Sequence, residues 1–149
     1  MKNIITLVII IFSSISSFSQ ILNPVKWTTS VEKTSKNEAT LIAVANIDKG
    51  WHLYSQTAPE LGPVPTKFTY NGAKTYLKKG NTQEGKGTMI HDPIFNVEIK
   101  FFKNEATFKQ RVKLNSNKPF VIKAAVEFMV CDDERCLPPT EVDLEFKVD

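Results

Sequence analysis

The sequence predicts an all-β domain folded as a two-sheet sandwich, and three observations support that prediction. Apolar and polar residues alternate along 97–101, 108–114 and 142–148, with the period of two that is typical of half-buried strands. Turn-forming clusters occur between the expected strands, for example at 48–50 and 71–72. No long stretch has helical periodicity, and the 8 prolines also disfavour long helices. Short strands at this spacing favour a sandwich of two sheets.

Further strands are expected at 40–47, which is rich in β-branched and small apolar residues, and at 67–70. The segment 120–131 alternates strictly, because every second residue from Phe120 to Val130 is apolar and this face must point into the core. Cys131 then falls on the opposite face. We therefore expect this strand to bring Cys131 to the surface or into a pocket beneath a covering loop.

The composition indicates one ordinary globular domain. The chain has 149 residues, of which 42% are hydrophobic and 23% are charged. A domain of this size buries enough surface for a real core, so it does not depend on a disulfide to fold. The net charge is only +3, and the lysines are dispersed among acidic residues. This pattern is typical of a solvated surface and disfavours nucleic-acid binding.

The N-terminus has the three-part layout of a secretory signal peptide. Lys2 supplies a positive start, residues 4–12 are almost wholly apolar, and residues 13–20 are mostly small and polar. The apolar run is shorter than the roughly 20 residues that span a bilayer, although a retained anchor is the alternative interpretation. We expect 1–20 to be removed and 21–149 to form a single domain. Export to the periplasm or beyond places the cysteines in an oxidising compartment.

The two cysteines, Cys131 and Cys136, lie at a tight connection between the strand ending at Cys131 and the strand ending at Val148. A static disulfide, a redox-active pair and a metal site are three open interpretations. Closing so short a loop contributes only roughly 2 kcal/mol, which is little for a bond selected for stability. A zinc site would need His52 and His91 as further ligands, and their spacing does not favour it.

The residues around the two cysteines differ in charge. Cys131 is followed by three acidic residues, which disfavour its thiolate, whereas Cys136 follows Arg135, which favours its thiolate. Unequal thiols of this kind are expected of an attacking and a resolving cysteine.

Three motifs resemble the N-terminal domain of the thiol:disulfide interchange protein DsbD. The first is Cys131…Cys136-Leu-Pro-Pro followed by 140–142, which is similar to the active-site hairpin of that family. The segment 50–56 resembles an aromatic segment near that active site, and 89–95 resembles its cap loop. The resemblance covers 25–149. Here the cysteines are separated by one residue fewer, and a histidine, His52, replaces a tyrosine.

The resemblance implies an immunoglobulin-like β-sandwich that works in the periplasm without a cofactor. Such a domain takes electrons from a thioredoxin-like partner, itself supplied by a membrane thiol reductase. It passes them to oxidised client proteins, including disulfide isomerases and thioredoxins of cytochrome c biogenesis. By this resemblance Cys136 is expected to form the mixed disulfide with partners and Cys131 to resolve it, which implies a thiol-disulfide oxidoreductase component.

Five further residues are candidates for supporting this site. His52 is expected to tune the pKa of a thiol or relay a proton, Tyr54, which has the same strand parity, to hydrogen-bond a thiolate, and Asp92 to assist proton transfer, as the resemblance implies. The alternatives are a surface histidine, a space-filling tyrosine ring and an aspartate that only forms a turn. Ile94 or Phe95 is expected to cap the sulfurs. The alternative for the whole chain is a secreted, non-enzymatic immunoglobulin-like binding module whose disulfide is static.

Overall fold

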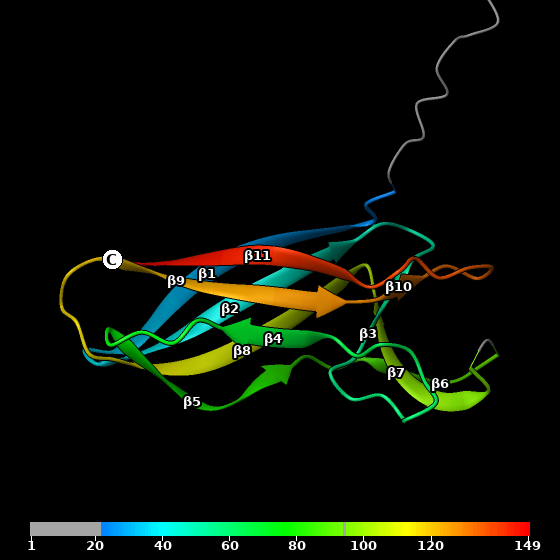
Figure 1. Ribbon diagram of the computed structural model, residues 1–149, viewed down its shortest axis with the longest axis horizontal. Coiled ribbons are helices and arrows are strands. Elements are labelled where there is room, and N and C mark those ends of the chain that lie inside the picture. The colour runs from blue at the N-terminus through cyan, green and yellow to red at the C-terminus, as the bar shows by residue number, and fades with distance from the viewer. Residues whose placement is uncertain (1–21, 94) are drawn as a thin grey trace, which may run out of the picture.

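Three antiparallel sheets make up the part of the chain that the computed structural model describes, residues 22–93 and 95–149 (Figure 1). The first sheet has the order β1-β2-β8-β5 and the second the order β11-β9-β4. The third sheet, with the order β10-β3-β7-β6, lies at one end of the molecule. The strands are β1 (Val25–Ser35), β2 (Glu38–Ile47), β3 (His52–Tyr54), β4 (Lys67–Tyr70), β5 (Tyr76–Glu84), β6 (Thr88–Asp92), β7 (Val97–Lys103), β8 (Glu105–Leu114), β9 (Phe120–Phe128), β10 (Val130–Cys131) and β11 (Thr140–Val148).

The first two sheets pack face to face and enclose the main core. Trp27 of β1 joins them, because its ring lies 5.8 Å from that of Phe68 in β4 and 5.5 Å from that of Phe128 in β9. Its ring also lies 5.7 Å from that of Phe108, on β8 of its own sheet. The all-β, immunoglobulin-like sandwich expected from the sequence is confirmed. The third sheet extends it, since β10 continues β9 after a break at Met129.

The central strands follow the alternation seen in the sequence, whereas several edge strands do not. Alternate residues of β8 and β9 are buried, as expected from their period of two. By contrast, β5 is exposed along most of its length, because it lies next to β8 at the edge of its sheet. Its sequence therefore lacks the apolar repeat that would have revealed it.

No helix that is long and apolar enough to cross a membrane occurs among residues 22–93 and 95–149. The expected signal peptide, residues 1–20, lies outside the described residues, and so does Ile94.

Candidate functional site

The third sheet has two faces of different character. One register row, Val130, Leu53 and Phe102, faces the main core. The next row consists of Cys131, His52 and Lys103, and it lies on the opposite face because successive strand residues alternate. The three-residue strand β3 therefore directs Leu53 into the main core and presents His52 and Tyr54 on the outer face. The candidate site is built on this outer face.

Cys131 is buried within a second apolar cluster on that face. None of its surface is exposed, and the cluster includes Tyr54, Ile99 and Phe101. The alternation along 120–131 thus predicted the correct face. Cys131 is therefore not at the surface, one of its two expected places, but packed inside this cluster.

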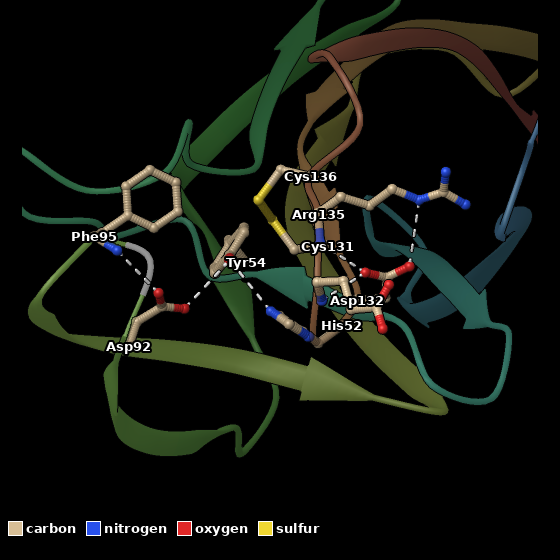
Figure 2. The surroundings of a disulfide bond; sticks show 9 residues. His52, Tyr54, Asp92, Phe95, Cys131, Asp132, Arg135 and Cys136 are labelled. Atoms are coloured by element: carbon tan, nitrogen blue, oxygen red, sulfur yellow. Dashed lines mark hydrogen bonds and ion pairs between the residues drawn. A yellow bond between two sulfur atoms is a disulfide. The ribbon is translucent and has the colours of Figure 1, made fainter.

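Cys131 and Cys136 form a disulfide with an S–S distance of 1.95 Å and a Cα–Cα distance of 4.0 Å (Figure 2). The intervening turn is organised by Asp132, whose Oδ1 accepts the backbone N–H groups of Glu134 at 2.9 Å and Arg135 at 2.8 Å. These two hydrogen bonds lower the pKa of Asp132. The turn therefore brings the two cysteines together by local hydrogen bonding, as aspartate side chains commonly do in turns.

Arg135 does not have the position expected from the sequence. Its Nε lies 3.6 Å from Oδ2 of Asp132, and its side chain points away from both sulfurs (Figure 2). The expectation that Arg135 favours a thiolate on Cys136 followed from adjacency in the sequence. The structure instead pairs this guanidinium with Asp132.

The two cysteines differ in exposure instead. Cys131 is fully buried, whereas Cys136 is only partly buried. A thiolate that attacks in line with the S–S bond can approach from solvent only at a sulfur with an open side. Exposure therefore favours Cys136 as the sulfur that a partner attacks.

A chain of buried hydrogen bonds runs beside the disulfide. Nε2 of His52 lies 3.2 Å from the hydroxyl oxygen of Tyr54, and this hydroxyl donates to Oδ2 of Asp92 at 3.4 Å (Figure 2). The second carboxylate oxygen of Asp92 accepts the backbone N–H of Phe95 at 3.1 Å. His52 is only 8% exposed, so the alternative that it is a surface histidine is wrong. Three of the predicted supporting residues are thus joined in one chain.

Burial sets the protonation of this chain. It lowers the pKa of His52, an effect that the nearby Asp92 partly opposes, so the imidazole is neutral at pH 7. Burial and the charge of Asp92 both raise the pKa of Tyr54, which keeps its hydroxyl proton. The site therefore holds a neutral imidazole and a phenol close to a disulfide.

Phe95 lies on the turn that connects β6 to β7. Its ring centroid is 6.1 Å from that of Tyr54 in an edge-on arrangement, and it packs against the cluster that contains Cys131. Asn96 closes the turn with φ 56, a left-handed conformation that asparagine tolerates, and donates its N–H to the Asp92 carbonyl at 2.8 Å. The expected cap segment 89–95 is thus mostly strand β6, and only its end is a turn.

Several residues of the site were missed by sequence reasoning. The ring of Phe101 lies 5.0 Å from that of His52, and Ile99 is buried in the same cluster. Ile90 and Met129 pack around it. The alternation at 97, 99 and 101 placed Ile99 and Phe101 on one face of a strand, but it did not show that this face adjoins the cysteines.

His91 lies apart from this cluster. It is exposed and interacts across its own hairpin, with Asn96 at 3.0 Å and Glu98 at 3.7 Å. Within residues 22–93 and 95–149 no group of three or more histidine, cysteine or acidic side chains could hold a metal ion. The zinc interpretation, which needed His52 and His91 together with the cysteines, is therefore not supported.

Three solved structures are similar to this fold. The DsbD N-terminal domain of Neisseria meningitidis in its reduced form has a TM-score of 0.55 at 15% identity, covering 87% of this chain and 92% of that one. The complex of the same organism's DsbD and PilB N-terminal domains gives 0.53 at 12%, covering 85% and 87%. The N-terminal periplasmic domain of ScsB from Proteus mirabilis gives 0.56 at 14%, covering 81% of this chain but only 44% of that one.

The similarity in sequence extends over nearly the whole chain. No curated protein matches it. The family model described as the N-terminal part of the thiol:disulfide interchange protein DsbD, however, matches residues 19–147. The chain therefore belongs to the family of DsbD N-terminal domains.

Proposed function

We propose that this protein is a periplasmic thiol:disulfide exchange protein that passes electrons from a thioredoxin-like donor to oxidised client proteins. The observation that carries this proposal is the unequal exposure of the two cysteines in one short-loop disulfide. Cys136 is partly exposed, whereas Cys131 is fully buried. A static bond does not need such a difference, whereas an exchange catalyst needs one sulfur to meet partners and one to resolve them.

The family and its solved members support the proposal. The Neisseria DsbD domain has been crystallised in a reduced form, and the same domain forms a complex with the PilB N-terminal domain. The ScsB domain is periplasmic. These are properties of those proteins, and the shared family makes a redox-active pair in a periplasmic protein the best interpretation of the present chain.

The electron transfer takes place in two exchanges. A donor thiolate attacks Sγ of Cys136, the S–S bond breaks, and its electron pair goes to Sγ of Cys131. The donor's second thiol then displaces Cys136 and leaves the pair reduced. In the second exchange the Cys136 thiolate attacks a client disulfide, and Cys131 resolves that mixed disulfide. The client is reduced by two electrons while Cys131 and Cys136 are oxidised.

The turn that carries Phe95 acts as the cap. Phe95 packs against the cluster around the disulfide and is fixed by its amide hydrogen bond to Asp92. A partner must displace this turn to bring its own sulfur in line with Cys136. The cap would therefore limit the access of small oxidants and reductants while a docked protein opens it.

The reduction potential of the Cys131–Cys136 pair tests the proposal. Thiol alkylation across a series of redox buffers gives this value. A potential between about −180 and −270 mV is expected, because exchange catalysts have values in this range. A potential below about −300 mV would identify a structural bond and favour the binding-module alternative.

Two single substitutions test the roles of the sulfurs. With an oxidised client, Cys131→Ser should accumulate a mixed disulfide at Cys136, because the resolving sulfur is absent. Cys136→Ser should form none. Electron transfer that persists in both variants would contradict the scheme.

A further inference from the structure

The side chain directly opposite Cys131 in the β10–β3 ladder is His52. Residues opposite each other in an antiparallel pair have Cβ atoms about 4.5–5.5 Å apart and project on the same face. Cys131 is fully buried and His52 is 8% exposed. A thiolate left on Cys131 in this buried, apolar cluster is strongly disfavoured, so its formation calls for a proton carrier beside it.

The hydrogen-bond chain determines which nitrogen of His52 carries the proton. Tyr54 has one hydroxyl proton and donates it to Oδ2 of Asp92. Its oxygen can therefore only accept from Nε2 of His52, 3.2 Å away, so Nε2 carries a hydrogen. A neutral imidazole has one N–H, which leaves Nδ1 bare and able to accept a proton.

We infer that His52 exchanges a proton with Cys131 through Nδ1, and that Tyr54 and Asp92 position it for this role. The inference rests on the proposed function, because it concerns the step in which Cys131 resolves a mixed disulfide. In this step His52 removes the proton from the buried Cys131 thiol, whereas the two sulfurs form and break the disulfide bonds.

The step balances as follows. The S–H proton of Cys131 moves to Nδ1 of His52, and the Cys131 sulfur attacks Sγ of Cys136. The Sγ–Sγ bond forms, and the bond between Cys136 and the client sulfur breaks with its electron pair on the client. The client thiolate takes a proton from solvent or from the imidazolium. In the reverse direction the imidazolium protonates Cys131 as it leaves.

The charged groups around His52 come from each strand and turn packed against it. They are Asp92 of β6, Lys103 opposite His52 on β7, and Asp132 and Asp133 of the turn after β10. The acidic groups stabilise the imidazolium, whereas Lys103 and burial disfavour it. Burial is the largest of these effects, so the neutral imidazole that the step requires is present at pH 7.

The resolving step can be timed with the reduced protein and the reagent 5,5′-dithiobis(2-nitrobenzoate). Cys136 releases one coloured thiolate as it forms the mixed disulfide, and Cys131 releases the second as it resolves it. His52→Gln is the test variant, because a glutamine N–H can replace Nε2–H toward Tyr54 but offers no base. His91→Gln is the matched control, since His91 is exposed and lies outside the site.

We expect the second release in wild type to level off across neutral pH, where the imidazole of His52 is already neutral and can take the Cys131 proton at any pH in this range. In His52→Gln this rate should be roughly 100-fold lower at pH 7 and should rise about tenfold per pH unit. His91→Gln should follow wild type. Coincident profiles for wild type and His52→Gln would overturn the inference and leave the proposed function intact. A wild-type protein with no second release would instead contradict the proposed function.

A measurement on the wild-type protein keeps the inference testable if the variant does not fold. The ¹⁵N chemical shifts of His52 report its tautomer directly. We expect the Nε2–H form in both redox states, with an imidazole titration that coincides with the inflection in the resolving rate. A hydrogen on Nδ1 in the neutral ring, or a titration that does not match the kinetic inflection, would overturn the inference.

Discussion

Phe95 donates its backbone N–H to Asp92, at 3.1 Å, within the turn that connects β6 to β7. The other carboxylate oxygen of Asp92 accepts the hydroxyl of Tyr54. One buried side chain, 2% exposed, therefore joins the β6–β7 turn to Tyr54. A movement of the turn that breaks the first bond removes one of the contacts that hold the Asp92 carboxylate, so the position of the turn and the organisation of the site are coupled.

Replacing Asp92 by alanine should loosen the cap. The change removes the acceptor of the buried Tyr54 hydroxyl and of the partly buried Phe95 amide, and we expect a loss on the order of 3 kcal/mol in unfolding free energy. Amide hydrogen exchange at 95–97 should accelerate more than exchange in β8. Glu98→Gln is the control, because Glu98 is exposed on the same hairpin and, among the described residues, forms an ion pair with His91 alone. Unchanged protection at 95–97 in Asp92→Ala would contradict the coupling.

Removing the ring of Phe95 should expose the disulfide to small reductants. Phe95→Ala deletes a partly buried side chain that packs on Tyr54 and the cluster around Cys131. We expect reduction by dithiothreitol to become at least several-fold faster, while the midpoint of thermal unfolding changes little. Met89→Ala is the matched variant, because Met89 lies on the same hairpin with 60% of its surface exposed. Equal reduction rates in Phe95→Ala and wild type would show that Phe95 is not the cap.

The stability of the oxidised protein should depend on His52 in mildly acid solution. Burial lowers the pKa of His52 in the folded state, so below about pH 6.5 the unfolded chain binds more protons than the folded one. Stability is therefore lost as the pH falls below that value, by at most about 1.4 kcal/mol per pH unit. Urea unfolding between pH 5 and 8 should show this loss in wild type and His91→Gln, and a smaller one in His52→Gln. Parallel curves for wild type and His52→Gln would refute it.

Several strands, β8 and β9 among them, and the cysteine face could be predicted because they follow from local alternation. The apolar repeat in 120–130 requires Cys131 to face away from the main core, and the structure confirms this. The identity of the supporting residues was accessible only through the resemblance. His52, Tyr54 and Asp92 come together through the register of β3, β7 and β6, which no single segment of the sequence specifies.

Two aspects of the site depended on side-chain direction and could not be predicted. Arg135 is next to Cys136 in the sequence, yet its guanidinium pairs with Asp132 and points away from the sulfurs. Likewise, adjacency to three acidic residues does not reveal that Asp132 folds back onto its own turn, where it accepts two backbone N–H groups. The sequence shows which charged residues lie near the cysteines. Hydrogen bonds in the folded chain decide where each of these charged side chains points.

The turn that Asp132 organises should tune the redox equilibrium. Its Oδ1 holds the backbone N–H groups of Glu134 and Arg135, which keeps the two thiols close before they join. Asp132→Ala removes this preorganisation, so the disulfide should form less favourably and its potential should become more oxidising. A tenfold change in the equilibrium constant corresponds to about 30 mV. Asp132→Asn retains an equivalent side-chain oxygen and should shift the potential less than Asp132→Ala.

Asp133 provides the control for this prediction. It lies in the same turn and is also acidic, but it makes no side-chain hydrogen bond or ion pair with any of the residues that the structure describes. Asp133→Ala changes the charge near the sulfurs by the same amount as Asp132→Ala while leaving the turn intact. Redox titration of the three variants therefore separates charge from turn geometry. If Asp133→Ala and Asp132→Ala shift the potential equally, charge alone acts, and the role assigned to the Asp132 hydrogen bonds is wrong.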